Sequence, residues 1–421
     1  MYWLRAPKAL SVWVMVGILM LCSSGAVVSA ASATGKIPIL MWVFPMGDLT
    51  RAIYDDFVIP AFEKENPDIE LTIVVLPWAN RDEKMMLGYI SGSGPDIAYL
   101  NVDFFPRFVN EGMLEPLDRY YTEEDFRDFL PNAIHAMTSD GQIWGFPIIQ
   151  SATIPMINAT MFRENGLDPN KPPTNWQELE QMGGKLTRRS DNPAQARYGI
   201  GWAQNATTTN ATFNPFLWSA GGDVFAPDGR SVIWDQPPGI EALDYLTDLH
   251  RQGLVGGAFA SGNVGIQLAN DASLGKILKT SGVSFDWSPG VVIGHKERVT
   301  YGTIAGYAMF NTCKNKDAAA RVMRFFTSSE IMGRLVGEWG YLGPRRSIRP
   351  SVYGEDAGWF VKFMEGAVYT RHDITHPLVR EVYKYLAPAV QRAVALQETP
   401  QAALELSARA ANMYLKENMA P

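Results

Sequence analysis

The sequence predicts an α/β fold with a mainly parallel sheet. Three short runs at residues 37–43, 69–76 and 96–100 have strand character, and two stretches of helical character separate them. The order strand, helix, strand, helix, strand is typical of α/β units. The chain has 421 residues and is 47% apolar, so at ~150 residues per domain it can bury the cores of two or three domains. Because no Gly/Ser-rich or Pro-rich linker separates two halves, we expect either one large domain or two domains joined by several short crossings.

Turn residues and one proline delimit the first elements. The helical stretch that begins near Thr50 contains Pro60, which lacks an N–H donor and should kink or split the helix. A turn at residues 66–68, Asn-Pro-Asp, leads into the second strand. The next helix covers residues 81–90 and is closed by the Ser-Gly-Ser-Gly segment at residues 91–94.

The middle of the chain repeats this pattern of helices and strands, with other residues at the turns and helix ends. Thr174 and Gln177 match a capping box that opens a helix, and the glycine pair at residues 183–184 should weaken or end that helix. Another helix follows the proline pair at residues 237–238. The apolar residues on one side of this helix are Ala242, Leu243, Leu246 and Leu249. A further strand is expected over residues 304–310.

The first 30 residues have the order of a secretory signal peptide. Arg5 and Lys8 give a cationic start, residues 9–21 are apolar, and the small residues at 28–30 suit cleavage after Ala30. The apolar run is too short to span a ~30 Å hydrocarbon core comfortably, and an uncleaved anchor is the alternative. We therefore expect an exported protein, in the periplasm or at the cell surface.

Cysteine and charge exclude several classes of protein. Cys22 lies in the expected signal peptide, where it would allow a lipid anchor, but Leu21 departs from the small residue that precedes lipidated cysteines, so simple cleavage is favoured. Cys313 is then the one remaining thiol, which rules out a disulfide framework and a cysteine-based zinc site. The net charge of −7 argues against a uniformly basic surface for nucleic acid.

No pattern in the sequence singles out catalysis, a metal or a cofactor. Among the five histidines only His372 and His376 are close, and Pro377 makes a regular helix around them doubtful, so hydrogen-bonding or surface histidines are favoured over a metal pair. The sequence contains no nucleophile elbow, phosphate loop or complete dinucleotide motif. A glycosidase would need two carboxylates ~5–10 Å apart, and no such pair stands out among 44 acids.

Several motifs run in order over nearly the whole chain. They are Phe62-Glu-Lys-Glu-Asn-Pro-Asp-Ile69, Gly94-Pro-Asp-Ile97, Gly112-Met-Leu-Glu-Pro-Leu-Asp118, Asp140-Gly-Gln-Ile-Trp-Gly-Phe-Pro147, Gly166-Leu-Asp-Pro169, Pro172-Pro-Thr-Asn-Trp-Gln-Glu-Leu179, Gly221-Gly222, Asn315-Lys-Asp-Ala-Ala-Ala320 and Gly340-Tyr-Leu-Gly-Pro-Arg345. Together they closely resemble the extracellular solute-binding proteins of bacterial ABC importers, in the sugar-binding group that includes the maltodextrin receptors.

The resemblance implies two α/β lobes around a ligand cleft, with several hinge crossings between them. The first lobe would take residues 31–149 and 305–345, and the second lobe residues 150–304 and 346–421. Such a protein is not an enzyme. It binds a carbohydrate, closes over it by hinge motion and delivers it to the membrane permease subunits. We expect a monomer without cofactor, metal or nucleic acid.

A sugar site needs aromatic faces and planar polar groups, and the loops at strand ends should supply them. The loop after the first strand offers Trp42, Phe44 and Asp48, although Trp42 is as well explained as a core residue. By the resemblance, Asp103 stands where maltodextrin receptors place a sugar-bonding Asp. Phe104 and Leu100 replace the Arg and Trp found nearby in those receptors, which favours a ligand unlike maltose.

The remaining candidates lie in the expected crossings and in the second lobe. They are Gln150, Ser151, Trp202, Asn205, Asn210, Asn270, Asp271, Gly302, Trp339, Tyr341 and Arg345. By the resemblance, Ser151 replaces a Glu of the maltodextrin receptors. Polar residues around 202–212 are equally explained as an exposed loop, and Trp339 almost equally as a core residue.

Two alternative functions stay open. One is a receptor for another solute, such as a glycerol phosphodiester, which would want a cationic pocket for which the predicted loops offer mainly Arg345. The other is an exported glycan-degrading enzyme that uses two carboxylates.

Overall fold

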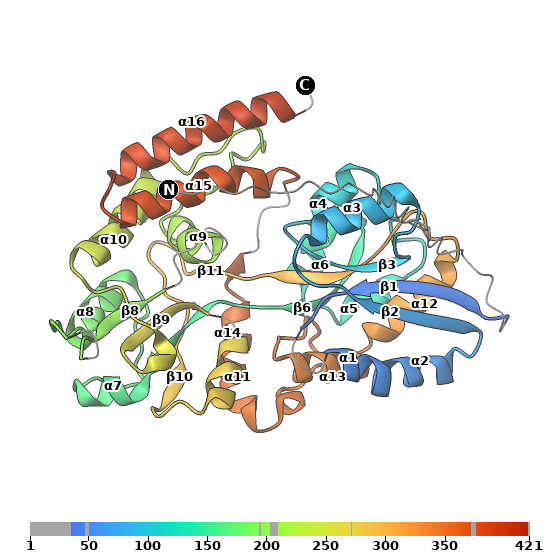
Figure 1. Cartoon of the computed structure of the whole chain (residues 1–421), viewed down its shortest axis with the longest axis horizontal. Coiled ribbons are helices and arrows are strands. Elements are labelled where there is room, and N and C mark those ends of the chain that lie inside the picture. The colour runs from blue at the N-terminus through green and yellow to red at the C-terminus, as the bar shows by residue number, and fades with distance from the viewer. Residues whose placement is uncertain are drawn as a thin grey trace, which may run out of the picture.

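The computed structural model consists of two halves that lie side by side along the longest axis (Figure 1). It describes residues 35–46, 50–192, 195–202, 209–270, 272–371 and 376–419. The expected signal peptide and Cys22 therefore lie outside the described residues. Within those residues, no helix has the length and apolar character to cross a membrane.

The first half is built on a five-stranded sheet in the order β2-β1-β3-β12-β6. Its strands are β1 (Ile37–Val43), β2 (Ile69–Val75), β3 (Ile97–Asn101), β6 (Gly145–Gln150) and β12 (Ile304–Met309). As predicted, the first three strands run parallel, with β1 between β2 and β3. Only β12 runs against its neighbours β3 and β6, because it enters the sheet from the second half rather than through a helical crossover.

Helices cover both faces of this sheet. They are α1 (Thr50–Ile53), α2 (Ile59–Glu65), α3 (Arg81–Ser91), α4 (Phe105–Asn110), α5 (Glu123–Arg127), α6 (Pro131–Ala136), α12 (Lys316–Phe326) and α13 (Ser329–Trp339), with a small hairpin of β4 (Thr138–Ser139) and β5 (Gln142–Ile143). A π-helical turn at Tyr54–Val58 separates α1 from α2, and Pro60 lies in the first turn of α2, where its missing N–H is tolerated. The predicted kink or split therefore takes the form of a change of helix type, because Ile53, Val58 and Ile59 keep helical backbone angles and the stretch stays helical throughout.

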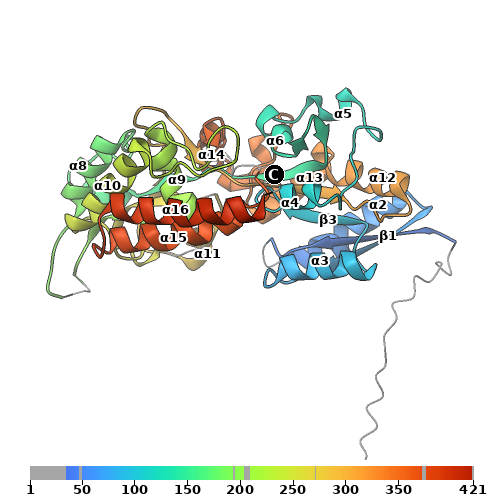
Figure 2. The same ribbon diagram turned by 90° about the horizontal axis from the view of Figure 1, so that it is seen from above.

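The second half contains a four-stranded sheet in the order β10-β7-β9-β8. Its strands are β7 (Ile154–Asn158), β8 (Tyr198–Gly201), β9 (Val264–Asn270) and β10 (Trp287–Pro289). The helices are α7 (Ala159–Glu164), α8 (Trp176–Leu186), α9 (Thr209–Ser219), α10 (Pro237–Arg251), α11 (Ala272–Ser281), α14 (Ala357–Ala367), α15 (Val379–Val394) and α16 (Pro400–Asn418), with 3-10 turns η2 (Phe259–Ser261) and η3 (Pro350–Asp356). The last two helices lie side by side along this half (Figure 2). The four predicted apolar residues of α10 are all buried.

Short segments connect the two sheets in the middle of the molecule. The chain passes from β6 to β7 within three residues, and from β11 (Thr300–Tyr301) to β12 within two. These segments bond to each other: the Ser151 N–H donates to the Thr303 carbonyl over 2.8 Å, and the Thr153 N–H donates to the Tyr301 carbonyl over 2.8 Å. A third segment, after α13, pairs with the first when the Gln150 N–H donates to the Leu342 carbonyl over 2.9 Å.

The crossing segments are themselves part of a packed core. One apolar cluster extends from the first sheet past the crossings to Phe360 and Phe363 of α14. A second cluster fills the space between the second sheet, α10, α15 and α16. β11 also pairs in parallel with β13 (Thr370–Arg371), which ties the second crossing to the segment after α14. The connection between the halves is therefore an ordered, hydrogen-bonded layer rather than a flexible linker.

The structure corrects the predicted ends of α8. The cap is Asn175, one residue later than predicted, and its side chain accepts a hydrogen bond from the Glu178 N–H over 2.9 Å. Thr174 instead bonds the Glu178 carboxylate, and these bonds lower the pKa of Glu178. The helix also runs through Gly183 and Gly184 to Leu186. Gly183 is needed for packing, because a Cβ there would lie 2.9 Å from Cδ1 of Ile200 in β8.

Replacing each of these two glycines with alanine should change stability in opposite directions. Gly184→Ala meets no atom within 4 Å and should raise the free energy of unfolding by about 0.5–1 kcal/mol, since glycine costs entropy in a helix. Gly183→Ala should lower it by about 1–3 kcal/mol through overpacking against β8. Urea unfolding of both variants measures the difference. Equal shifts would contradict the close approach of α8 to β8.

Candidate functional site

Aromatic residues gather at the edge of the first sheet where β1, β2 and β3 end. Phe44 follows β1, and its ring stacks on that of Trp78 with centroids 4.6 Å apart. Tyr99 of β3 meets Trp78 edge-on at 6.0 Å. Phe44 and Tyr99 are buried, whereas 38% of Trp78 is exposed and its Nε1–H donates to the Pro45 carbonyl over 2.9 Å. The edge thus holds an indole in a fixed orientation while leaving part of it open to solvent.

A carboxylate and a guanidinium lie beside this aromatic group. Arg81, the first residue of α3, places its Cζ 5.2 Å from the Trp78 ring centroid and its Nη2 3.7 Å from Oδ2 of Asp103. Asp103 follows β3, and its Oδ1 is buried without a hydrogen-bond partner among the residues that the structure describes. Burial raises the pKa of Tyr99 well above its usual value, with smaller effects from Tyr341, Arg81 and Asp103. Tyr99 therefore stays neutral beside these groups.

Sequence reasoning missed Trp78 and Arg81. Both lie in the stretch between β2 and α3, whose loop opens at the same edge of the sheet as the loops after β1 and β3. The parallel order of these strands, which the sequence predicts, is the signal that could have pointed to this loop. Trp42, in contrast, is half-buried within β1 and packs against Gly88 of α3, so it lies away from that edge.

The candidates in the crossings are buried. Gln150 and Ser151 are 2% and 4% exposed, and the Ser151 hydroxyl accepts a hydrogen bond from the Thr303 N–H over 3.0 Å. Gly302 packs against this crossing, because a Cβ there would lie 2.3 Å from the Ser151 carbonyl oxygen. Gln150 Oε1 is buried without a hydrogen-bond partner among the described residues, which a water or a ligand hydroxyl would satisfy.

The segment after α13 brings Tyr341 near Tyr99, whose pKa it raises, while two other candidates serve the first half. Trp339 is buried and meets Tyr54 edge-on at 6.3 Å. Arg345 lies 3.9 Å from the Phe129 ring centroid, and its Nη1 lies 3.3 Å from Oδ2 of Asp128. These contacts engage Arg345, the cationic side chain that the sequence suggested for binding an anionic ligand.

In the second half, Trp202 is half-buried at the end of the edge strand β8. Its ring lies 5.1 Å from His250 and 6.4 Å from Phe216, measured between centroids. Burial lowers the pKa of His250 to about 4. Asp48, Asn205, Asp271 and His372 lie outside the described residues. The backbone of Asn210 lies in the first turn of α9, and the backbone of Asn270 lies at the end of β9.

Helix α15 carries two further candidates that the sequence did not single out. Arg380 places its Nε 3.6 Å from Oδ2 of Asp103 and its Cζ 5.3 Å from the Phe104 ring centroid, so this face of α15 meets the first half. Tyr383 lies on the same face, three residues later. Its hydroxyl accepts a hydrogen bond from Nδ2 of Asn214 over 2.7 Å.

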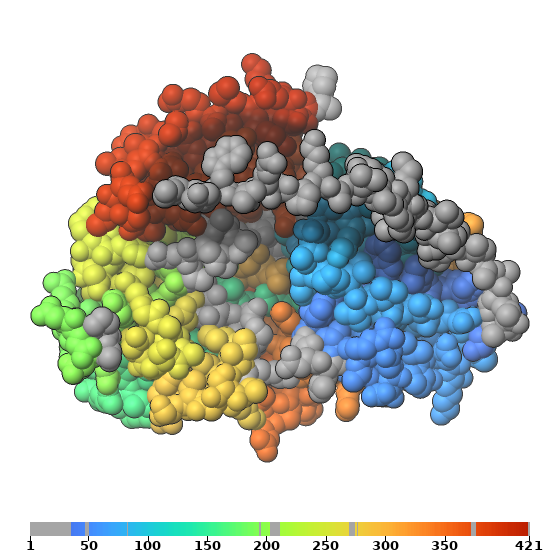
Figure 3. All heavy atoms as spheres, viewed as in Figure 1, coloured from blue at the N-terminus to red at the C-terminus, as the bar shows by residue number. Residues whose placement is uncertain are grey.

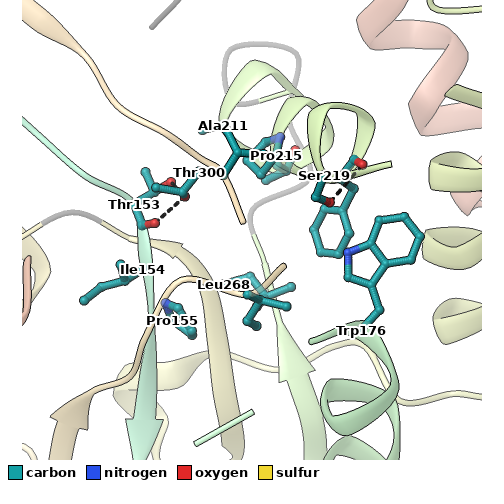
Figure 4. A pocket seen from close by; sticks show the side chains of 13 residues that line it. Thr153, Ile154, Pro155, Trp176, Ala211, Pro215, Ser219, Leu268 and Thr300 are labelled. Carbon is teal, nitrogen blue, oxygen red and sulfur yellow. Dashed lines mark hydrogen bonds between the residues drawn. The ribbon is translucent and has the colours of Figure 1, made fainter. Parts of the chain in front are cut away.

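A small pocket lies in the second half beside the crossings (Figure 4). Thr153 and Thr300 line it, with hydroxyl oxygens 3.0 Å apart, and Trp176 and Leu268 lie opposite. Its volume of about 40 Å³ suits a few water molecules at ~10–15 Å³ each, not a sugar ring. In the space-filling view, the blue atoms of the first half and the yellow atoms of the second half stand on either side of the middle of the molecule (Figure 3). The contact between Arg380 of α15 and Asp103 brings α15 close to the sheet edge that carries Trp78.

The structure places His376 and Cys313 in buried surroundings. Across the parts of the chain that the structure describes, no group of three His, Cys, Asp or Glu side chains could hold an ion. His376 stacks on Phe225 with centroids 4.2 Å apart, and burial lowers its pKa. Cys313 is buried, which raises the pKa of its thiol to about 12.

The comparison with family models decides which family this is. Residues 47–333 match the model of the bacterial extracellular solute-binding proteins. The chain belongs to this family. Among curated relatives, a binding protein of Brucella abortus is 26% identical over 303 residues, which cover 69% of this chain and 72% of that protein. The maltotriose-binding protein of Pyrococcus abyssi is 25% identical over 292 residues, which cover 66% of this chain and 60% of that protein.

The fold of this chain also matches the folds of solved structures. The cyclic α-maltosyl-1,6-maltose binding protein of Arthrobacter globiformis aligns with a TM-score of 0.80 at 22% identity, covering 91% of this chain and all of that chain. The expected two-lobed α/β fold is thereby confirmed, as is the expected membership in the solute-binding family.

Proposed function

We propose that the chain is the carbohydrate-binding subunit of an ABC importer, and that the sugar binds between the halves against Trp78, Asp103 and Arg81. The observation that carries this proposal is the half-open indole of Trp78, fixed on Phe44 and flanked by a carboxylate and a guanidinium. Sugars combine apolar C–H faces with a rim of hydroxyls, so they need an aromatic platform beside planar polar groups. The maltotriose and cyclic maltosyl-maltose ligands named for the relatives support this substrate class.

The two halves act as the two lobes in this proposal. The first lobe takes residues 31–149 and 305–345, and the second takes residues 150–304 and 346–421. The hydrogen-bonded crossings serve as the hinge. Tyr383, together with the candidates Asn205 and Asp271, supplies the contacts of the second lobe. A ligand that contacts both lobes shifts the equilibrium toward the closed arrangement. The protein works outside the cytoplasm, hands its sugar to membrane permease subunits and catalyses no reaction.

A screen of melting temperatures over mono- and oligosaccharides tests the proposal. At a ligand concentration 100 times the Kd, binding stabilises the folded protein by about 2.7 kcal/mol, which raises the melting temperature. The same incubations are analysed for cleaved products, and a glycerol phosphodiester is included. A thermal shift with intact sugar supports the proposal. Release of products would support the enzyme alternative. A thermal shift with the phosphodiester alone would show that this solute, and not a sugar, is the ligand.

A further inference from the structure

The contact between Asp103 and Arg380 joins the two halves of the molecule. Asp103 follows β3 in the first sheet, whereas Arg380 lies in α15, whose neighbouring residues Val379 and Val382 are buried in the core of the second half. The guanidinium Nε lies 3.6 Å from Oδ2 of Asp103, and its Cζ lies 5.3 Å from the ring centroid of Phe104, the next residue. Arg380 thus contacts two adjacent residues of the opposite half.

The same contact occupies the carboxylate that the proposed sugar site needs. Both Arg81 and Arg380 approach the same oxygen, Oδ2, at 3.7 Å and 3.6 Å. The other oxygen, Oδ1, is buried, and none of the described residues gives it a hydrogen bond. A sugar hydroxyl that bonds Oδ2 therefore competes with the two guanidinium groups for this oxygen. Of Asp103, Arg81 and Arg380, only Arg380 belongs to the second half and moves with it.

We propose that Arg380 is an affinity-setting residue of the site: it holds Asp103 across the halves when no sugar is present, and the sugar must displace it. This proposal rests on the proposed function for the identity of the ligand, but not for the contact between the halves. Asp103 then has two alternative partners, Arg380 in the sugar-free protein and a ligand hydroxyl in the complex. The ion pair opposes sugar binding by the free energy that it contributes to the sugar-free arrangement.

The test uses Arg380→Gln, which removes the charge and keeps a polar side chain that extends to the position of the arginine Nε. Partly exposed ion pairs contribute modestly, so we expect the variant to bind the selected sugar about twofold to fivefold more tightly in calorimetry. Arg380→Lys keeps the charge and should stay closer to the natural protein. Arg321→Gln is the matched control, because Arg321 pairs with Asp68 within the first half and should leave the affinity unchanged. Weaker binding by Arg380→Gln would overturn the proposal and make Arg380 a sugar contact.

A second measurement needs no sugar. Spin labels on cysteines at the exposed positions Lys64 and Gln181, one in each half, report the distance between the halves. Cys313 should not be labelled, because its thiol is buried and its pKa is raised. Arg380→Gln should change the distance distribution of the sugar-free protein, and Asp103→Asn should change it in the same way. Because both variants remove the same contact, the double variant should show no larger change than either single variant. An unchanged distribution overturns the contact between the halves, whereas failure of every sugar to bind overturns only the proposed function.

Discussion

Replacing Trp78 with alanine is expected to weaken sugar binding by about 2 kcal/mol, or roughly thirtyfold in Kd. Among the described aromatic side chains at this edge, the indole combines a fixed orientation with substantial exposure, whereas Phe44 and Tyr99 beside it are buried. Removing it takes away the apolar platform and one side of the Arg81 contact. Calorimetric titration with the sugar selected in the melting screen measures the loss.

Two further variants separate loss of the platform from loss of stability. Trp78→Phe keeps an aromatic face and should retain most of the affinity. Trp287→Phe is the control, because Trp287 lies in β10 and meets Trp359 at 5.7 Å, far along the chain from the strand ends that form the site. It should lower the melting temperature without changing the Kd. An unchanged Kd for Trp78→Ala would show that the sugar does not use this edge.

Replacing Gly302 with alanine is expected to lower the free energy of unfolding by about 2–3 kcal/mol. The added Cβ would lie 2.3 Å from the Ser151 carbonyl oxygen and 2.7 Å from Cγ2 of Thr370, so it would push apart the segments that join the halves. Both neighbours are held in place, Ser151 through Thr303 and Thr370 through β13 pairing with β11. Urea unfolding measures the loss, and the label distance between the halves should broaden.

The matched control for this variant is Gly358→Ala. Gly358 lies in α14, and an added Cβ there meets no atom within 4 Å, so alanine should raise stability slightly. If Gly302→Ala were as stable as the natural protein, the crossings would not be packed as closely as the hinge requires.

Local pattern predicted the elements of the first half well. The parallel strands β1, β2 and β3 follow from β-branched runs and turn residues. The antiparallel insertion of β12 between β3 and β6 was not predictable in this way. It pairs Ala305 with Asn101, residues that are about 200 positions apart, and local sequence carries no signal for such a pairing.

The site was predicted only in part, because exposure is a tertiary property. Asp103 contacts Arg81, and Tyr341 affects the pKa of Tyr99, so both lie near the aromatic edge, and their role in binding stays a prediction. Trp339 is a side chain of the same type as Trp78, yet it is buried against Tyr54, while Trp78 is open. Arg380 reaches the site from a helix that begins 276 residues after Asp103, and only the folded arrangement brings the two together.

The most direct test of the central claim is a crystal structure of the protein with the sugar selected by the melting screen. We expect a sugar ring stacked on Trp78, a hydroxyl hydrogen-bonded to Asp103 in place of Arg380, and contacts from the second half that include α15. A sugar bound to one half alone, or bound away from Trp78 and Asp103, would contradict it.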